Sequence, residues 1–335
     1  ALDHQPLQQS GPAAEGVAVG HQHGDHADRP GVAEDLDQLV GRPQGGLAVQ
    51  PDGKVIIVGD FGLINQASQL RIARLNYDGT LDTSFQVGTG ADSYINRVVL
   101  QPDGKVLIGG GFDTYNGIER LGIARLNSDG SLDSTFNLGS PGPSNSVADI
   151  AVLPDGKILI AGYFGYINNV RAGSIARLNP DGTRDMSFNP GGQGAVNGGD
   201  LTLVSAVSIQ PDGKILIGGV FLWYNGVSRN SFARLNSDGS LDTSINSSAP
   251  NVFATNLQPD GKMLIGGSFA SVNGTPQSRL ARLNADGSLD STFDIGSGAD
   301  ENIFNVEFQS NNYLVVVGRF RRFAGQSHAG IARLK

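Results

Sequence analysis

The chain has 335 residues, a formal net charge of −8 at pH 7, no cysteine, and an apolar content of 39%. The absence of cysteine excludes a disulfide scaffold, a zinc ribbon and thiol catalysis, and the negative charge argues against a partner with a phosphate backbone. No run of twenty apolar residues occurs, so no membrane-spanning helix is predicted. The 48 glycines and 15 prolines indicate many short strands joined by tight turns.

Residues 1–46 differ in composition from the rest of the chain, and the sequence begins at Ala1 without the regions of a signal peptide, which indicates a processed or excerpted chain. The stretch includes a His-x-His-x-Asp-His run that matches metallo-β-lactamase-like hydrolases, with His21, His23 and His26 as candidate metal ligands. That fold needs further histidines from later strands, and only His328 follows. We therefore interpret the run as a polar loop, with metal binding as the alternative.

From residue 47 onward the sequence repeats with a period near fifty residues. The pentapeptide Gln-Pro-Asp-Gly-Lys, or a variant of it, begins at positions 50, 101, 153, 210 and 258, and an altered copy begins at 309. A second signature, Ala-Arg-Leu-Asn-x-Asp-Gly, follows each of the first five copies, and a shortened version ends the sequence. Repeats of this length are typical of propellers and solenoids.

Each repeat contains four strand-like runs, which the second repeat illustrates at residues 95–100, 105–110, 122–126 and 132–136. Asp-Gly pairs separate the first run from the second and the third from the fourth, which predicts antiparallel hairpins. The second run is apolar at consecutive positions, which predicts burial on both faces, as in stacked blades. Because a β-helix uses fewer residues per turn and parallel strands, we predict an all-β propeller of four-stranded antiparallel blades.

These repeats resemble the bacterial tandem repeats of the delta-60 type. Their pattern is Leu-Gln-Pro-Asp-Gly-Lys-Ile-Leu-Ile-Gly-Gly followed by Ala-Arg-Leu-Asn-x-Asp-Gly-Ser-Leu-Asp-x-Ser-Phe, and the resemblance covers residues 47–335. The resemblance implies propeller blades with a strand plan similar to that of NHL repeats, often within large secreted or surface proteins. It implies no catalytic residues.

Six repeats are clear, and residues 1–46 are interpreted as an eroded seventh blade, with six blades and an N-terminal leader as the alternative. Residues 16–20, 29–33 and 36–37 can be aligned with the second, third and fourth strands of a blade. Residues 1–5 are candidates to close the last blade, because Ala-Leu-Asp resembles the start of its fourth strand. The expected blades in residues 47–335 are 47–85, 86–136, 137–188, 189–245, 246–294 and 295–335.

The third-strand signature resembles the calcium-binding loop of integrin-type propellers. In the second repeat its polar positions are Arg125, Asn127, Asp129 and Asp133. The first calcium ligand would be a carboxylate, whereas every repeat has arginine there, so we expect the guanidinium to pair with Asp129 or Asp133. These four residues are predicted to be structural, and no cofactor is predicted, with calcium as the alternative.

Candidate catalytic groups are few. Five of the six lysines occupy the same pentapeptide position, and residues 47–335 contain only one histidine, so neither Schiff-base chemistry nor a serine triad is predicted. Carboxylate chemistry stays open, but no spacing selects a pair. We therefore assign no catalytic residue, and a polysaccharide-acting hydrolase or lyase is the least favoured reading. The acids outside the repeated positions are Asp60, Asp113, Glu119, Asp149, Asp200, Asp300 and Glu301.

The loop after the second strand varies between repeats within a constant frame, which reads Phe-x-x-Tyr-Asn-Gly from Phe112. Equivalent loops are expected on one face of a propeller, where aromatic rings can stack on sugars or anchor a protein partner. Repeated positions such as that of Phe112 are interpreted as packing residues, and Trp223 and Tyr166 occupy a variable position and are the stronger candidates. The ligand-binding candidates are Trp223, Tyr166, Tyr224 and Tyr115.

The sequence therefore predicts a non-catalytic scaffold for protein interaction or assembly, with a carbohydrate-binding propeller as the alternative. Its expected partner is a protein or a glycan, without nucleic acid or membrane insertion, and the chain is expected to be a subunit or fragment of a larger assembly. The family resemblance places it outside the bacterial cell or on its surface. A pocket repeated in every blade would favour a lectin, whereas a single unrepeated apolar patch would favour a protein partner.

Overall fold

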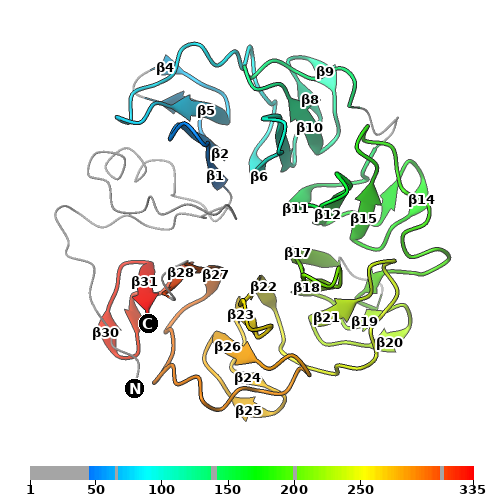
Figure 1. Ribbon diagram of the computed structural model, residues 1–335, viewed down its shortest axis with the longest axis vertical. Coiled ribbons are helices and arrows are strands. Elements are labelled where there is room, and N and C mark those ends of the chain that lie inside the picture. The colour runs from blue at the N-terminus through cyan, green and yellow to red at the C-terminus, as the bar shows by residue number, and fades with distance from the viewer. Residues whose placement is uncertain (1–44, 65–66, 137–141, 199–201, 310–312) are drawn as a thin grey trace. The chain divides into compact units, whose positions relative to one another are not determined.

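The computed structural model describes residues 45–64, 67–136, 142–198, 202–309 and 313–335, in which the regular elements are all β-strands (Figure 1). In these ranges no helix is long and apolar enough to cross a membrane. Residues 1–44 lie outside the described residues. The predicted eroded blade or leader at residues 1–46 therefore falls outside the described residues, except for Gly45 and Gly46 of the first strand. The predicted closing role of residues 1–5 and the candidate metal site at His21, His23 and His26 also fall outside them.

The described residues form seven antiparallel sheets of three strands each, and six of these sheets are the blades of the predicted propeller. In each blade the second strand lies between the first and the third. The first strands are β1 (Gly45–Val49), β6 (Ile95–Leu100), β11 (Val147–Val152), β17 (Leu203–Ile209), β22 (Val252–Leu257) and β27 (Ile303–Phe308). The second strands are β2 (Val55–Gly59), β7 (Val106–Gly110), β12 (Ile158–Gly162), β18 (Ile215–Val220), β23 (Met263–Gly267) and β28 (Leu314–Gly318). The third strands are β5 (Ile72–Leu75), β10 (Ile123–Leu126), β15 (Ile175–Leu178), β21 (Phe232–Leu235), β26 (Leu280–Leu283) and β31 (Ile331–Leu334).

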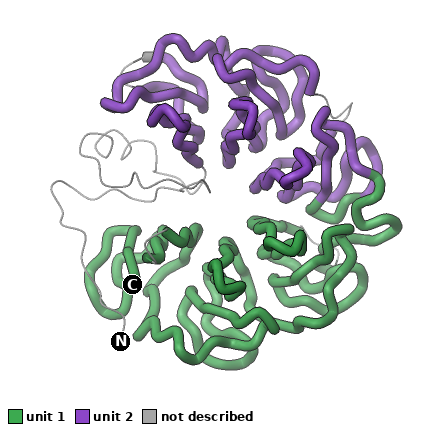
Figure 2. Tube along the Cα trace, in the orientation of Figure 1, with its two compact units in different colours: residues 1–16, 172–175, 186–335 green, residues 17–171, 176–185 purple. Residues whose placement is uncertain are grey.

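The blades belong to two compact units (Figure 2). Within the described residues, the N-terminal unit comprises 45–171 and 176–185, and the C-terminal unit comprises 172–175 and 186–335. Blades 1 to 3 fall in the N-terminal unit, whose boundary runs through β15, and blades 4 to 6 fall in the C-terminal unit.

The predicted Asp-Gly hairpins join the first strand to the second. In blade 2, Gln101 N donates to Lys105 O at 2.8 Å and Gly104 N donates to Gln101 O at 2.9 Å. Asp103 Oδ1 accepts the backbone N–H of Lys105 at 3.1 Å, and Gly104 has a φ of +82°, which glycine adopts without strain. Both residues of the Asp-Gly pair are therefore needed by the turn.

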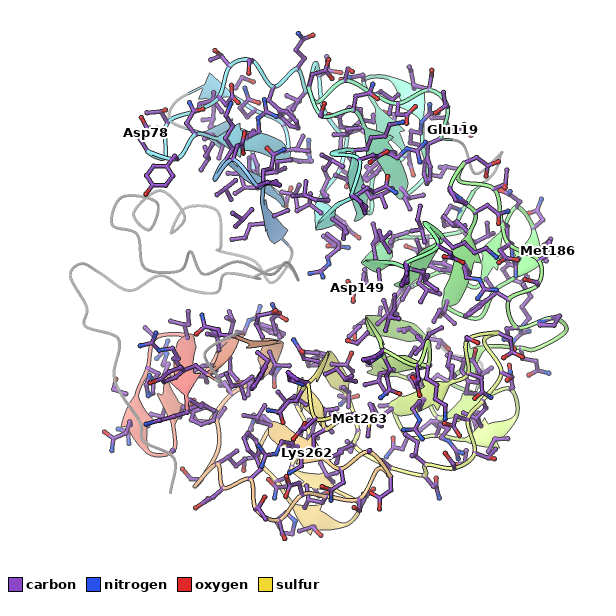
Figure 3. All side chains as sticks on the ribbon, viewed as in Figure 1. Asp78, Glu119, Asp149, Met186, Lys262 and Met263 are labelled. Atoms are coloured by element: carbon purple, nitrogen blue, oxygen red, sulfur yellow. The ribbon has the colours of Figure 1, made fainter. Side chains whose placement is uncertain are left out.

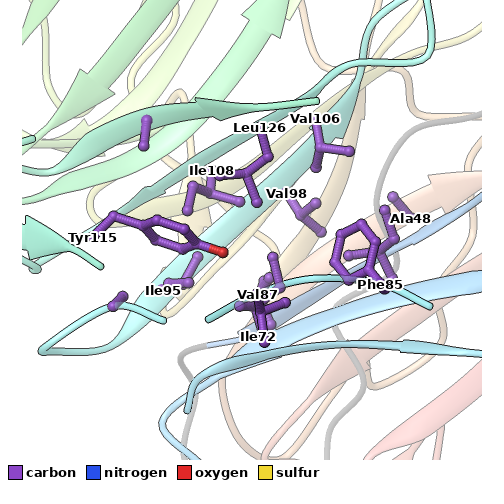
Figure 4. Packing of buried hydrophobic residues seen from close by; sticks show 14 of the residues in the cluster. Ala48, Ile72, Phe85, Val87, Ile95, Val98, Val106, Ile108, Tyr115 and Leu126 are labelled. Atoms are coloured by element: carbon purple, nitrogen blue, oxygen red, sulfur yellow. The ribbon is translucent and has the colours of Figure 1, made fainter. Parts of the chain in front are cut away.

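The hydrophobic core lies between successive blades of a unit. Figure 4 shows the cluster between blades 1 and 2, where Ile72 of β5 and Phe85 pack against Val98 and Ile108 of blade 2. All five residues of β7 and of β23 are buried, and each of these strands lies in a blade that has a neighbouring blade on both sides within its own unit. This matches the burial on both faces that the consecutive apolar positions predict, because a middle strand is covered by the blades on either side.

The Gly-Gly pair that ends the second strand permits close contact between blades. A Cβ on Gly266 would lie 2.7 Å from Ile303 Cγ2 of blade 6, and a Cβ on Gly267 would collide with the carbonyl oxygen of Asn251. The first glycine therefore makes room for the next blade, and the second makes room for the first strand of its own blade.

Two features of the blade differ from the predicted strand plan. The fourth strand, expected at residues 132–136, is shortened to an isolated bridge between Leu126 and Leu132. A two-stranded hairpin follows each second strand, and its turn is of type I′ in blade 4, with φ of 48° at Asn225 and 79° at Gly226. The hairpin strands are β3 (Leu63–Ile64), β4 (Ala67–Ser68), β8 (Thr114–Tyr115), β9 (Ile118–Glu119), β13 (Tyr166–Ile167), β14 (Val170–Arg171), β19 (Trp223–Tyr224), β20 (Val227–Ser228), β24 (Ser271–Val272), β25 (Thr275–Pro276), β29 (Arg322–Phe323) and β30 (Gln326–Ser327).

Candidate functional site

The repeated charged residues form an ion-pair triad in each of five blades, in which the aspartate is buried and the lysine is about 30% exposed. In blade 2, Asp133 Oδ2 accepts from Lys105 Nζ at 2.8 Å and from Arg125 Nε at 2.7 Å. Its Oδ1 accepts the backbone N–H of Thr135 at 2.9 Å and the hydroxyl at 2.6 Å. The other Lys–Asp–Arg triads are Lys54–Asp82–Arg74, Lys157–Asp185–Arg177, Lys214–Asp242–Arg234 and Lys262–Asp290–Arg282.

The residues of the calcium-like motif are all engaged in contacts of the scaffold. Arg125 pairs with Asp133, donates from Nη1 to Pro180 O of blade 3 at 2.6 Å, and lies over the ring of Phe136 at 4.8 Å. Asp129 accepts the backbone N–H and the hydroxyl of Ser131, and Asn127 also donates to that hydroxyl. The guanidinium therefore supplies the positive charge that a calcium ion supplies in the loop it resembles.

The low pKa values of the triad aspartates predict that the protein unfolds in acid. Burial alone would raise the pKa of the triad aspartates Asp82, Asp133, Asp242 and Asp290. Hydrogen bonds from the lysine, from the side chain and backbone of the adjacent Ser or Thr, and from the arginine outweigh this effect. Each pKa therefore lies well below the usual range. The folded pKa lies below the unfolded value of about 3.9, so the stabilisation is complete above about pH 5 and is lost as the pH falls. We expect the midpoint of thermal unfolding, followed by circular dichroism, to drop steeply between about pH 5 and pH 2. A midpoint that stays constant over this range would contradict the assignment.

Two of the four aromatic candidates are buried, which corrects their inclusion among the ligand-binding residues. Tyr115 and Tyr224 are 0% exposed, and burial raises the pKa of both hydroxyls above the usual range. Tyr224 Oη donates to Gly239 O at 2.7 Å. Both rings therefore fill the space beneath their hairpins, as was expected of the repeated positions.

The other two candidates are exposed on separate hairpins. Tyr166 of β13 is 49% exposed in the N-terminal unit, beside Val170 of the same hairpin at 43%. Trp223 of β19 is 37% exposed in the C-terminal unit, and Leu222 and Val227 of the same hairpin are 42% and 41% exposed. We call Leu222, Trp223 and Val227 the blade-4 patch.

The blade-4 patch stands on an extended and well-anchored sheet. The strand β16 (Ala195–Val196) adds a third strand to β19 and β20, so that Trp223 has Val196 on one side and Ser228 on the other. Asn225 at the hairpin turn accepts from Gly194 N at 2.7 Å and donates to Asn189 Oδ1 at 2.7 Å. The backbone of this hairpin is therefore anchored by a neighbouring strand and at its turn.

The patch is not repeated in the other two blades of its unit. Blade 5 has Ala270, Ser271 and Thr275 at the corresponding positions, and blade 6 has Arg321, Arg322 and Gln326. Sequence reasoning identified Trp223 but missed Leu222 and Val227, although an alignment of the hairpins shows that polar or small residues replace both in blades 5 and 6.

The acids outside the repeated positions do not gather into one site. Asp149 of β11, labelled in Figure 3, pairs with Arg97 of β6 at 2.9 Å, and Asp300, which precedes β27, accepts the backbone N–H groups of Arg321 and Arg322 at the β29–β30 hairpin of the same blade. Glu119, also labelled there, is exposed on β9, and Asp200 lies outside the described residues. Across the described ranges, no group of three or more potential metal ligands is found.

A family model decides the relationship of the chain to known proteins. The model for the domain of unknown function DUF5122, a β-propeller, matches residues 50–85, 101–136, 153–188, 210–244, 258–293 and 309–335. The chain belongs to the DUF5122 β-propeller family. No curated protein shows a significant match to it.

Solved structures similar to this DUF5122 propeller share little sequence with it. The extracellular domain of a putative hybrid two-component system from B. thetaiotaomicron has a TM-score of 0.51 and 16% identity, covering 86% of this chain and 34% of that one. A gluconolactonase from Xanthomonas campestris has a TM-score of 0.47 and 16% identity, covering 98% of both chains. Virginiamycin B lyase from Staphylococcus aureus has a TM-score of 0.48 and 15% identity, covering 83% and 79%. At such identities the likeness concerns the fold alone, and the DUF5122 propeller spans about a third of the first of these proteins.

Proposed function

We propose that this DUF5122 propeller is a non-catalytic binding domain that serves as a scaffold for protein interaction and contacts its partner through the blade-4 patch. The observation that carries the proposal is the exposed Trp223 on an anchored hairpin that has two further exposed apolar side chains, a combination that blades 5 and 6 do not repeat. Tryptophan flanked by aliphatic side chains is typical of the centre of a protein interface, where desolvated aromatic residues contribute most of the binding energy.

The repeated polar residues support a scaffold role because their hydrogen-bonding groups serve the blades. In blade 2, Lys105 and Arg125 both contact Asp133, and Arg125 also donates to a backbone carbonyl of the next blade. A carboxylate held in two ion pairs and two hydrogen bonds is a poor proton donor or nucleophile at neutral pH, since its pKa is depressed. The most frequent acids of the chain therefore stabilise blades.

A protein partner is favoured over a glycan because blades 5 and 6 of the same unit do not repeat the patch. Leu222 and Val227 also offer no hydrogen-bonding side chains for the hydroxyl groups of a sugar. Carbohydrate binding centred on the Trp223 ring is the second candidate.

A location outside the bacterial cell fits the proposal. The similar structure with a TM-score of 0.51 is the extracellular domain of a putative hybrid two-component system, and the propeller covers 34% of that chain. In such a chain the blade-4 patch would dock a neighbouring domain or a second surface protein.

Trp223→Ala is expected to abolish partner binding without unfolding the protein. We expect proteins retained from a surface extract of the host bacterium to include at least one that is depleted about tenfold or more on the variant, because loss of a central anchor costs about 2 kcal/mol or more. Tyr77→Ala is the matched control, since Tyr77 is a 59% exposed aromatic residue in blade 1.

The retained protein is then purified and its affinity for the three chains is measured by calorimetry. A partner that binds the parent and Tyr77→Ala equally, but not Trp223→Ala, supports the proposal. Retention unaffected by Trp223→Ala contradicts it. A parallel glycan array decides for the second candidate if a glycan binds reproducibly and is lost in the same variant.

A further inference from the structure

The first strands of five blades contain a β-bulge near their beginning. The register shifts across one extra residue, which directly follows the first buried side chain of the strand. A bulge leaves its extra residue outside the regular pairing and changes the direction of its side chain. The bulged residues are Asn96, Ala148, Ser205, Phe253 and Phe304.

Where the bulged residue is polar, it joins two blades. Asn96 Nδ2 donates to Val147 O of the next first strand at 2.9 Å, and Ser205 Oγ donates to Val252 O at 2.9 Å. Alanine and phenylalanine have no donor for such a bond, so it cannot form at Ala148, Phe253 or Phe304. Among the five bulged strands, only those of blades 5 and 6 place a large apolar side chain there, which makes these two positions candidates for function.

The two phenylalanines form one surface in the C-terminal unit. Their strands β22 and β27 are neighbours (Figure 1), and the ring centroids of Phe253 and Phe304 lie 6.0 Å apart with an interplanar angle of 36°. Both side chains are only partly buried. They therefore present aromatic surface that the described residues cover only in part.

A guanidinium lies beside this aromatic pair. Arg319 Cζ is 5.8 Å from the ring centroid of Phe304, the residue is exposed, and its backbone N–H donates to Asn302 O at 2.9 Å at the start of β27. Within the described residues, the Arg319 side chain has no carboxylate partner. A guanidinium held over a ring keeps its N–H edge available for a bidentate contact with a carboxylate.

The two blades that carry this site lack the net negative charge of the whole chain. Residues 246–335 contain eight basic and seven acidic side chains, whereas the chain as a whole has a net charge of −8. Asn251 and Asn302, which precede β22 and β27 at the same end, add amide groups that can bind hydroxyls.

We propose that Phe253, Phe304 and Arg319 form a binding site for a uronic acid residue of an acidic glycan. The C–H face of the sugar ring packs on the aromatic pair, and its carboxylate pairs with the guanidinium. The surface is open, which suits one residue of a chain whose neighbours stay in solvent. The site is separate from the blade-4 patch and does not depend on the function proposed for it.

The test uses the full chain and three hexameric probes, namely α-1,4-linked galacturonic acid, its neutral counterpart of galactose, and L-glutamic acid. We expect the uronic acid hexamer to bind in calorimetry, with an affinity about tenfold or more above that of either other probe. Equal binding of the galactose hexamer would remove the role of the carboxylate. Equal binding of the glutamate hexamer would assign the surface to acidic peptides and overturn the proposal, as would the absence of binding.

The chain's own repeats supply variants that are compatible with the fold. Blade 5 has Ser268 at the position of Arg319, and blade 4 has Ser205 at the position of Phe253. Arg319→Ser is expected to weaken uronic acid binding about tenfold, and Phe253→Ser about fivefold. Arg321→Ser removes the same charge from the neighbouring loop and is the matched control, with a change below about twofold. If Arg321→Ser weakens binding as much as Arg319→Ser, the attraction is a diffuse charge effect and the site is wrong.

Discussion

Asp133→Ala is expected to lower the free energy of unfolding by about 3–5 kcal/mol, because it removes the shared counter-charge of two cations. The Asp133 side chain is 5% exposed and Arg125 is 9% exposed, so little water can replace the lost carboxylate. The variant leaves Arg125 with its carbonyl and aromatic contacts but without a negative charge, and it also removes the acceptor for Thr135.

Denaturant unfolding of the parent and the variant, followed by circular dichroism and by fluorescence, measures this loss. Asp103→Ala is the matched control, because Asp103 is an exposed aspartate of the same blade that accepts one backbone hydrogen bond. We expect this control to cost about 1 kcal/mol. If both variants lose the same stability, the buried triad does not contribute what its geometry indicates.

The same triad shows where sequence reasoning succeeds and where it stops. Arg125 and Asp133 flank a single Asp-Gly turn, so their pairing follows from a local hairpin, and it was among the pairings expected. Lys105 lies 28 residues from Asp133, and its Nζ reaches the carboxylate only because the second and third strands are paired in one register. No local pattern specifies that register, so the lysine was seen as repeated but was not connected to the aspartate.

The strand plan differs from expectation for local reasons. After Leu132, the Asp133 side chain accepts the backbone N–H of Thr135, which replaces a ladder bond with a turn and ends the fourth strand. The additional hairpins have strands of only two residues, too short to show an alternating pattern. Their Asn-Gly turns were visible as part of a frame, yet the frame was interpreted only as a loop.

Exposure on the hairpins was also predicted incompletely. Trp223 and Tyr224 are consecutive in a strand, and successive side chains point to opposite faces, so only one of them could be expected to face solvent. The position of Tyr224 is taken by Ile167, Val272 and Phe323 in other blades, and all three are buried. That apolar column distinguishes the buried tyrosine from the exposed tryptophan. The sequence does not show that Phe253 and Phe304 are bulged residues, because the apolar pattern of the strand is compatible with pairing with or without an extra residue.

The buried tyrosines provide the second large effect. Tyr224→Ala is expected to lower the free energy of unfolding by about 3–5 kcal/mol, the range for removing a large buried aromatic side chain, because the ring is 0% exposed beneath the hairpin. Chemical denaturation measures the loss. A loss below about 1 kcal/mol would mean that the hairpin closes over the missing ring, and the residue would then not be the packing anchor that its burial indicates.

The hydroxyl groups separate packing from hydrogen bonding at the same position in two blades. Tyr224→Phe is expected to cost about 1 kcal/mol, since it removes the donor to Gly239 O and leaves the ring in place. Tyr115→Phe is its matched control: the buried Tyr115 Oη has no hydrogen-bond partner among the described residues, so its removal is expected to be neutral or stabilising. A larger loss from Tyr115→Phe than from Tyr224→Phe would contradict this assignment. The expected order would show that the repeated tyrosine is retained for its ring, and that blade 4, whose hairpin carries the exposed Trp223, gains an extra hydrogen bond beneath its patch.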